Sequence, residues 1–238
     1  MVPVIENMPS VSNYQDQTHL LVAVDCIIFG FDKEELKILL IKRNFEPEMG
    51  KWSLMGGFLQ PNETSENAAN RVLETLTGLQ DVYLDQVHAY TDPKRDPVER
   101  TISITYYALI NSEDHNEELT KQHSAQWFSL NEAPELIFDH GQMVQHAINR
   151  LRYKTSVQPI GFELLPEKFT MRQLQRLYET ILNEEIDKRN FAKKINQLDV
   201  LIKLEEKDMS SSKKGSFLFT FDKDKYEANT KNGVSFKL

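Results

Sequence analysis

Residues 56–79 read GGFLQPNETSENAANRVLETLTGL, a pair of glycines, a polar loop and a helix-forming segment in succession. We expect a helix over residues 64–77 that ends at Gly78, because glycine is a common residue just beyond the end of a helix. The preceding residues, 52–59, predict a short strand interrupted by a tight loop at Gly56 and Gly57. The local order is therefore strand, loop, helix.

Six positions of this stretch match the frame of the Nudix box. In that frame a glycine, five residues, a glutamate and seven residues precede an Arg-Glu-apolar-x-Glu-Glu-x-Gly-apolar run. The matching residues are Gly57, Glu63, Arg71, Leu73, Gly78 and Leu79. The segment therefore resembles a Nudix domain, which implies an α/β/α sandwich with a mixed sheet. The resemblance also implies an ion pair between Arg71 and Glu63 that holds the loop.

The helical glutamates of the box are missing from this chain. Their positions hold Val72, Thr75 and Leu76, which together offer one neutral hydroxyl. Mg²⁺ needs hard oxygen ligands in near-octahedral geometry, and Glu74 lies about 100° or 200° around the helix from the lost positions. Without the metal, attack on a diphosphate loses charge stabilisation and activation of the nucleophile. We therefore predict no metal, no cofactor, no catalytic residue and no enzymatic activity.

The segments around the box predict an α+β unit. The expected strands are 19–31, 36–43, 52–59, 82–90, 101–110 and 125–130, and a second helix is expected at 140–153. The first two strands read as a hairpin. We place this unit at residues 19–155, after a polar N-terminal arm at 1–18. Cys26, the single cysteine, lies in the first apolar run, where a small core residue is the expected role.

Charge divides the chain near the same boundary. The 238 residues carry a formal net charge of −8. Residues 1–155 hold 13 basic and 23 acidic side chains, whereas residues 156–238 hold 15 basic and 13 acidic ones. This asymmetry predicts two units with different partners. The N-terminus lacks the basic start of a signal peptide and no apolar run approaches the roughly 20 residues of a membrane span, so we expect a cytoplasmic protein with no membrane partner.

Residues 156–238 contain two helices, a turn and two short β-type runs, the order of a winged helix-turn-helix. Thr170 and Gln173 predict a capping box at the start of the first helix. Asp187 is the expected cap of the second helix, which runs to about residue 197. The apolar stripes of the two helices are Leu174, Leu177, Tyr178 and Ile181, and Phe191, Ile195 and Leu198. The β-type runs at 200–204 and 216–221 would form the wing.

The basic and amide side chains of this unit fall outside its apolar stripes. Side chains of these types contact phosphates and base edges in the major groove, and helix-turn-helix docking brings the start of the second helix to that groove. The lysines between the two β-type runs would lie at the tip of the wing. The predicted DNA-binding residues are Arg172, Lys188, Arg189, Asn190, Lys193, Lys194, Gln197, Lys213 and Lys214.

The two units together resemble the Nudix-related transcriptional regulators, over about residues 20–238. Three runs outside the box carry the likeness: LIFDH at 136–140, LLPEKFT at 164–170 and DKRNF at 187–191, the last similar to the start of the group's recognition helix. The resemblance implies a homodimer that binds a palindromic operator in double-stranded DNA. It also implies that the Nudix-like domain senses a small effector and does not hydrolyse it.

Within that group, the degenerate box is most similar to that of the arabinose-responsive regulators of pentose utilisation. The resemblance implies a repressor that its sugar effector, L-arabinose, releases from the operator. A pentose needs charged or amide groups for its hydroxyls and an aromatic face for stacking, in the cleft between the strand ends and the glycine pair. The predicted effector-binding residues are Asp25, Lys42, Asn44, Trp52, Gly56, Tyr90 and Arg100.

Three other functions stay open on the sequence. An ADP-ribose-responsive regulator of NAD metabolism would bind the nucleotide without turnover, an active Nudix hydrolase would cleave diphosphates with Mg²⁺, and a protein-interaction module would do neither. The acidic first unit disfavours a polyanionic effector through long-range repulsion, although local arginines could override this effect. Titration of operator binding with arabinose, xylose and ADP-ribose separates the regulators.

Overall fold

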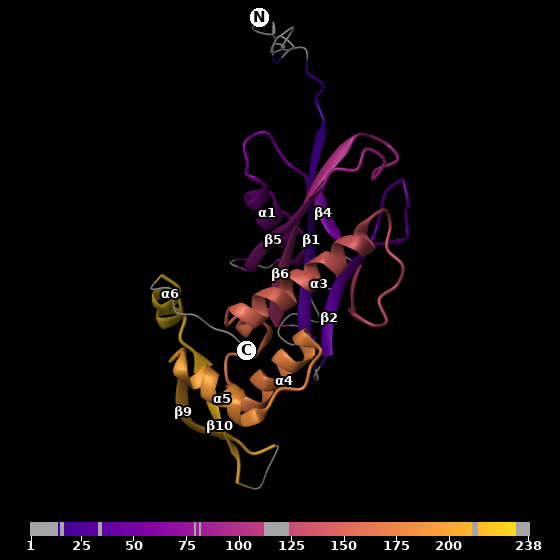
Figure 1. The fold of residues 1–238 in the computed structure, drawn as a ribbon. Helices are drawn as coiled ribbons and strands as arrows, with labels where there is room; N and C mark the ends of the chain where they lie inside the picture. Colours follow the sequence, from indigo (N-terminus) through magenta and orange to yellow (C-terminus); the bar gives the residue numbers. More distant parts are fainter. Residues whose placement is uncertain are drawn as a thin grey trace, which may run out of the picture.

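The computed structural model describes residues 14, 17–32, 35–78, 80, 82–111, 124–210 and 214–231. Along the chain, an N-terminal domain (β1 to α3) is followed by a C-terminal domain (η2 to α6), both drawn in Figure 1. Leu79, Lys213, the turn at 33–34 and most of the predicted N-terminal arm lie outside the described residues. The predicted α+β class is confirmed.

A mixed sheet of seven strands forms the N-terminal domain. Its strands are β1 (Leu21–Asp32), β2 (Glu35–Lys42), β3 (Trp52–Ser53), β4 (Met55–Phe58), β5 (Tyr83–Tyr90), β6 (Thr101–Asn111) and β7 (Ala125–Ser129). The central strand β1 pairs antiparallel with β2 and β4 and parallel with β6. The β1–β2 hairpin predicted from the sequence is therefore confirmed, and the parallel β1–β6 pair makes the sheet mixed.

Both faces of β1 are buried, which explains why Asp25 is the one charged residue in its buried part, residues 24–31. Alternate side chains contact different layers: Ile27 and Phe29 belong to the core that includes α3 (His140–Val157), whereas Cys26 and Ile28 belong to the core beneath α1 (Ser65–Thr77). Figure 1 shows the two helices on opposite sides of the sheet. The domain is thus an α/β/α sandwich, and Cys26 is a core residue as expected.

The glycine pair does not form the predicted tight loop. Gly56 and Gly57 lie inside β4, paired with Asp25 and Val24, and neither has a positive φ. A Cβ on Gly56 would lie 2.5 Å from an Asp25 carboxylate oxygen, and one on Gly57 would lie 2.9 Å from Val72 Cγ2. These two positions need glycine because neighbouring side chains pack directly against the backbone, and the prediction of a turn there is wrong.

Helix α1 has the local signals that the sequence predicts. The Thr64 side chain accepts a hydrogen bond from the Asn67 amide, and Gly78 ends the helix with φ of 71°. Helix α3 is longer than expected, since residues 154–157 continue it beyond Tyr153. It ends at Gln158, the residue before Pro159, because a proline disfavours helical geometry in the residue that precedes it.

The C-terminal domain is a winged helix-turn-helix. Its elements are η2 (Phe162–Leu164), β8 (Phe169–Thr170), α4 (Met171–Leu182), α5 (Lys188–Gln197), β9 (Leu201–Asp208), β10 (Ser216–Phe221) and α6 (Lys223–Lys231). The capping box of Thr170 and Gln173 and the Asp187 cap are both present. The predicted stripes of α4 and α5 are buried, and β8, β10 and β9 form a small sheet in that order.

Two parts of this domain were not predicted correctly. Strand β9 continues to Asp208, four residues beyond its expected end, and α6 was not expected at all. Helix α6 is polar around most of its circumference, so its sequence lacks an apolar period. Contacts with other elements of the domain hold it: Tyr226 packs on Phe221 with ring centroids 5.5 Å apart, and Asn229 donates to the Leu198 carbonyl at 2.7 Å.

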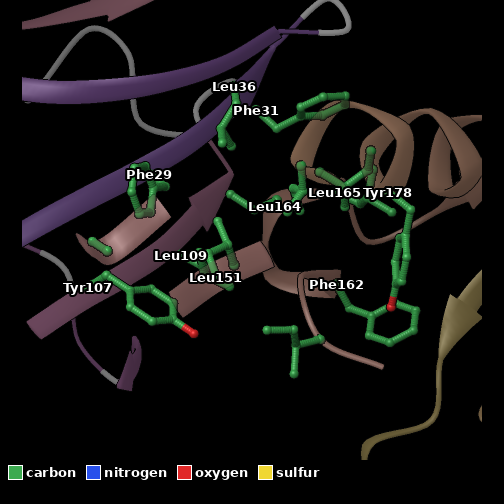
Figure 2. Packing of buried hydrophobic residues seen from close by; sticks show 14 of the residues in the cluster. Phe29, Phe31, Leu36, Tyr107, Leu109, Leu151, Phe162, Leu164, Leu165 and Tyr178 are labelled. Carbon is green, nitrogen blue, oxygen red and sulfur yellow. The ribbon is translucent and has the colours of Figure 1, made fainter. Parts of the chain in front are cut away.

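One hydrophobic core runs through both domains. Figure 2 shows Leu109 and Leu151 of the N-terminal domain beside Leu164 and Leu165, which lead into the winged helix. Helix α3 packs against α4, and Arg152 Nε donates to the Ile181 carbonyl at 3.0 Å near the end of α4. The C-terminal domain is therefore packed against the helix that leaves the sheet. Among the described residues, no helix combines the length and apolarity needed to cross a membrane.

Candidate functional site

The register of the sheet brings four of the predicted effector-binding residues together in two pairs. Asp25 on β1 lies opposite Gly56 on β4. Lys42 on β2 lies opposite Trp52 on β3, with its Nζ atom 5.2 Å from the Trp52 ring centroid. Asn44 is exposed in the loop after β2. Only the pairing of strands distant in sequence could show which of these residues are neighbours.

Asp25 belongs to a buried ionic cluster, which consists of Asp25, Arg95, Ser103, Asp139 and His140. The Ser103 hydroxyl donates to one Asp25 carboxylate oxygen at 2.5 Å. Arg95 Nη2 lies 3.6 Å from that same oxygen, and the Arg95 side chain is only 4% exposed. Arg95 also donates to both carboxylate oxygens of Asp139, from Nε at 3.0 Å and from Nη2 at 2.9 Å. The Arg95 guanidinium thus pairs with two carboxylates, those of Asp139 and Asp25.

His140 is the first residue of α3 and completes this cluster. The Leu54 amide donates to His140 Nδ1 at 3.2 Å, so the ring proton is on Nε2, 3.8 Å from an Asp25 oxygen. Burial lowers the pKa of His140, and this effect outweighs the nearby carboxylates, which raise it. The imidazole is therefore neutral at pH 7. The start of α3 thus carries a neutral ring next to the carboxylates of Asp25 and Asp139.

A second arginine lies close to the cluster. The Arg43 guanidinium carbon lies 3.7 Å from the Phe45 ring centroid and 5.5 Å from that of Phe138. Burial lowers the Arg43 pKa, while Asp96 and Asp25 raise it, so both carboxylates lie within electrostatic reach. Arg43 and Arg95 are therefore two guanidinium groups at this end of the sheet, both close to carboxylates of Asp25, Asp96 or Asp139.

Three further predicted effector residues make contacts within the protein. Tyr90 is buried, and its hydroxyl lies 2.7 Å from His146 Nδ1 on α3; burial raises the pKa of Tyr90 to about 12. Trp52 packs edge-on against Phe128 at 4.8 Å. Arg100 donates from Nη1 to the Asp92 carbonyl at 3.0 Å, across the loop between β5 and β6. That these residues also contact an effector stays a prediction.

The Nudix-like box has its predicted ion pair. Arg71 Nε donates to a Glu63 carboxylate oxygen at 2.9 Å, and Arg71 Nη2 donates to the Phe58 carbonyl at 3.1 Å. The hydrogen bond from Arg71 is the main reason that the pKa of Glu63 is lowered. Val72 is buried against the glycine pair and Thr75 is exposed, so the side chains at the positions of the missing glutamates do not fit Mg²⁺. Within the described residues, no group of three or more His, Cys, Asp or Glu side chains is arranged to hold a metal.

The predicted DNA-binding side chains gather around α5. Lys188, Arg189, Asn190, Lys193 and Gln197 are exposed, and Lys194 is half-buried. Arg172 on α4 and Lys188 line one concavity of about 340 Å³ together with Arg176. Lys214 is exposed just before β10. Because Asp187 accepts from the Asn190 amide at 2.9 Å, the start of α5 is fixed beside this surface.

The wing carries two lysines that the sequence analysis did not single out. Lys203 Nζ lies 3.6 Å and Lys207 Nζ lies 4.6 Å from the centroid of the Phe217 ring, which is partly exposed. Both lysines are on β9. The sequence reasoning ended that strand at residue 204, so Lys207 was not placed on the wing. A longer run of alternating side chains was the signal that could have found it.

Comparison with known families divides the chain in the same order as the structure. Residues 19–147 match the model of the NUDIX domain. Residues 161–221 match the model described as the NrtR DNA-binding winged helix domain. These two matches agree with the sandwich and with the winged helix-turn-helix, respectively.

Two known proteins, one of them in two crystal structures, are among those similar to this chain. The "ADPR responsive transcriptional repressor NtrR" of Acinetobacter baylyi is 34% identical over 88% of this chain and 85% of its own length. The crystal structure of Shewanella oneidensis NrtR complexed with a 27mer DNA has a TM-score of 0.81 and 26% identity, over 87% of this chain and 95% of that one. The NUDIX domain of the same NrtR, in a cocrystal with ADP ribose, has a TM-score of 0.50 and 26% identity, over 59% and 94%.

These findings overturn the predicted arabinose-responsive regulator of pentose utilisation. The relative that matches 88% of the chain responds to ADPR by its name, and neither of the two proteins described above is named as an arabinose regulator. The sequence reasoning took the sugar effector from the likeness of the degenerate box, and weighed the net charge of the domain against a polyanionic effector only as a secondary argument. Near the cluster, individual groups matter more than the net charge of the domain, and the guanidinium groups there belong to Arg43 and Arg95.

Proposed function

The chain belongs to the Nudix family, with an NrtR-type winged helix domain after the Nudix domain, and on this premise we propose that it is a transcriptional repressor controlled by ADP-ribose. The observation that carries the proposal is the 34% identity to an ADPR responsive repressor across 88% of the chain, because both domains align in one order. DNA would bind to the winged helix-turn-helix, and ADP-ribose to the Nudix domain.

The charges of the Nudix domain support a ligand with a diphosphate. Arg95 lies 3.6 Å from an Asp25 oxygen, Arg43 is within electrostatic reach of the same carboxylate, and Arg100 is on the loop that also carries Arg95. Guanidinium groups bind phosphate oxygens well because they offer several fixed N–H donors. The diphosphate would lie against these arginines. The pair of Lys42 and Trp52 offers a cation and an aromatic face for the rest of the nucleotide.

We further propose that the domain binds ADP-ribose without hydrolysing it. Val72 and Leu76 stand where carboxylates would hold Mg²⁺, and Val72 is packed into the core against Gly57. The neighbouring Glu74 is exposed on another face of the helix. The ion pair of Arg71 and Glu63 then has an architectural role, since it holds the segment between β4 and α1.

The DNA-binding form would be a homodimer on a palindromic operator. One helix-turn-helix reads one half-site, and two half-sites lie on one face of the duplex when they are one or two helical turns apart. The exposed basic side chains of α5 supply the major-groove surface, and Lys203, Lys207 and Lys214 of the wing supply contacts to the backbone. We place the domain boundary after residue 155, in the last turn of α3 and before η2.

Operator binding measured with and without ADP-ribose tests this function. A duplex that the full chain selects from a random pool serves as the probe in a fluorescence anisotropy titration. We expect ADP-ribose to weaken binding about 5- to 150-fold, the usual range for coupled sites, and L-arabinose to have no effect. The double variant Arg189→Ala, Lys193→Ala should lose the duplex and still bind ADP-ribose in calorimetry. Equal operator affinity with and without ADP-ribose would refute the proposal.

A further inference from the structure

Helix α3 connects the buried ionic cluster to the DNA-binding domain. At its start, Asp139 and His140 belong to the cluster around Asp25. Towards its end, Arg152 Nε donates to the Ile181 carbonyl in the last turn of α4 at 3.0 Å. Figure 1 shows α3 running along the sheet and reaching the C-terminal domain beside α4. A displacement at one end of this 18-residue helix therefore has a direct route to the helix-turn-helix.

Asp139 occupies the N-cap position of α3 but does not cap it. Aspartate is among the best N-cap residues, because its carboxylate accepts from the free amides of the first turn. In this protein Thr64, Thr170 and Asp187 all make that bond at the starts of α1, α4 and α5. At Asp139 no side-chain cap bond forms, since both carboxylate oxygens accept from Arg95. The Asp139 carboxylate thus uses the donors of Arg95, and its backbone (φ −96°, ψ 12°) lies outside the extended region of the three capping residues, so capping would require the start of α3 to move.

Another anion can compete with the two carboxylates that hold Arg95. Its buried guanidinium lies between Asp139 and Asp25, so two carboxylates share one positive charge, and His140 beside them is neutral. The two nitrogens in contact with carboxylates are Nε and Nη2; the third, Nη1, has no hydrogen bond within the part of the chain that the structure describes. Arg95 also lies on the loop that carries Arg100, next to the proposed diphosphate site.

We propose that Arg95 transmits effector binding to the winged helix by exchanging Asp139 for the diphosphate of the ligand. Without ligand, Arg95 holds the Asp139 carboxylate away from the amides of α3. With ligand, Arg95 turns its donors to the phosphate oxygens, and Asp139 is freed to cap the first turn of α3. The first turn then changes position, and the contact of Arg152 with α4 carries this movement to the DNA-reading surface. The inference rests on the proposed function and adds its regulation.

The exchange has the property that allosteric coupling requires, a two-state element that both sites bias. The ligand favours the capped state because it competes for Arg95. By the same shift of populations, any change that favours the capped state tightens ligand binding and weakens operator binding. A cluster that only stabilised the fold would predict the opposite for the ligand, since damage to it would weaken binding.

Asp139→Asn is the decisive variant. The amide has no charge for Arg95 and is still a good N-cap, so the capped state should dominate without ligand. We expect operator affinity without ADP-ribose to fall to that of the ligand-bound wild type. The ratio of operator affinities without and with ligand should fall below twofold, and ADP-ribose should bind severalfold more tightly in calorimetry. Asp139→Ser, which also caps and is uncharged, should behave alike and guards against one variant failing to fold.

Asp85→Asn is the matched control. It removes the ion pairs of Asp85 with Arg150 and Lys154 on α3, which lie away from the cluster. This variant should respond to ADP-ribose within twofold of the wild type. If the wild type responds and Asp139→Asn keeps its response and its ligand affinity, the exchange is refuted and the proposed function stands. If the wild type itself shows no response to ADP-ribose, the proposed function fails and the exchange fails with it.

Discussion

Replacing Gly56 with alanine places one methyl group against the centre of the buried ionic cluster. The new Cβ would lie 2.5 Å from Asp25 Oδ1 and 3.1 Å from the Val24 carbonyl oxygen. The carbonyl is part of the central strand β1 and cannot move away. The Asp25 carboxylate must therefore shift, although its other oxygen is held by Ser103 and lies near Arg95. Overpacking of this kind costs about 1–3 kcal/mol.

The loss is large enough to measure by thermal unfolding. In a chain of this length, 1 kcal/mol corresponds to about 2–4 °C in Tm, so Gly56→Ala should lower Tm by roughly 2–12 °C. Gly141→Ala is the control: a Cβ there meets nothing within 4 Å, and the residue lies in α3. Alanine at that position should raise the stability by about 0.4–1 kcal/mol. The two substitutions add the same atom and differ only in its surroundings.

A double-mutant cycle then shows whether the Asp25 carboxylate causes the loss. In an Asp25→Ala background the nearest clashing atom is gone, so Gly56→Ala should cost less than in the wild type. The difference should be about 0.5–3 kcal/mol, the usual coupling between groups in contact. An equal cost in both backgrounds, or no loss of Tm in the single variant, would contradict the packing derived for β4 and Asp25.

Three further predictions concern chemistry, DNA and pH. Incubation of the full chain with ADP-ribose and Mg²⁺ or Mn²⁺ should give turnover below about 0.1 per second, a hundredfold under a typical enzyme. Faster release of AMP would contradict the argument that Val72 and Leu76 leave the helix without metal ligands. Lys193→Ala should weaken operator binding and reduce the slope of log affinity against log salt by about one, whereas Lys51→Ala in the Nudix domain should leave the slope unchanged. Because burial lowers the folded-state pKa of His140, the unfolded chain binds a proton near pH 6.5 that the folded chain does not. The free energy of unfolding should therefore fall as pH falls below about 6.5, and His140→Gln should remove that part of the dependence in urea titrations between pH 5 and 7.

The caps and strands were predictable because their causes are local. The Thr170 capping box, the Asp187 cap and the glycine that ends α1 each depend on residues within four positions of one another. The apolar run of β1 likewise predicts a strand buried on both faces. Such signals also predicted the winged helix-turn-helix, whose two apolar stripes are buried as the spacing requires.

Contacts between distant segments could not be predicted in the same way. The role of Gly56 depends on its pairing with Asp25, 31 positions earlier, and the sequence offered only a turn. Helix α6 has no apolar period and is held by Phe221 and Leu198. The effector class was predicted wrongly because it was taken from the likeness of the degenerate box, and the residues of that box record the loss of the metal ligands and not the chemistry of the effector.

By itself, then, the sequence determined the two domains, their order and the loss of the helical glutamates from the Nudix box. Only the tertiary structure decided which charged groups meet. It places Arg95 between Asp25 and Asp139, residues from three separate segments, at the start of the helix that leads to the DNA-binding domain. The physical reason is that a buried charged group must be paired, and here the donors of a single guanidinium pair with two carboxylates. The partners are chosen by strand pairing and helix packing, which no local spacing records.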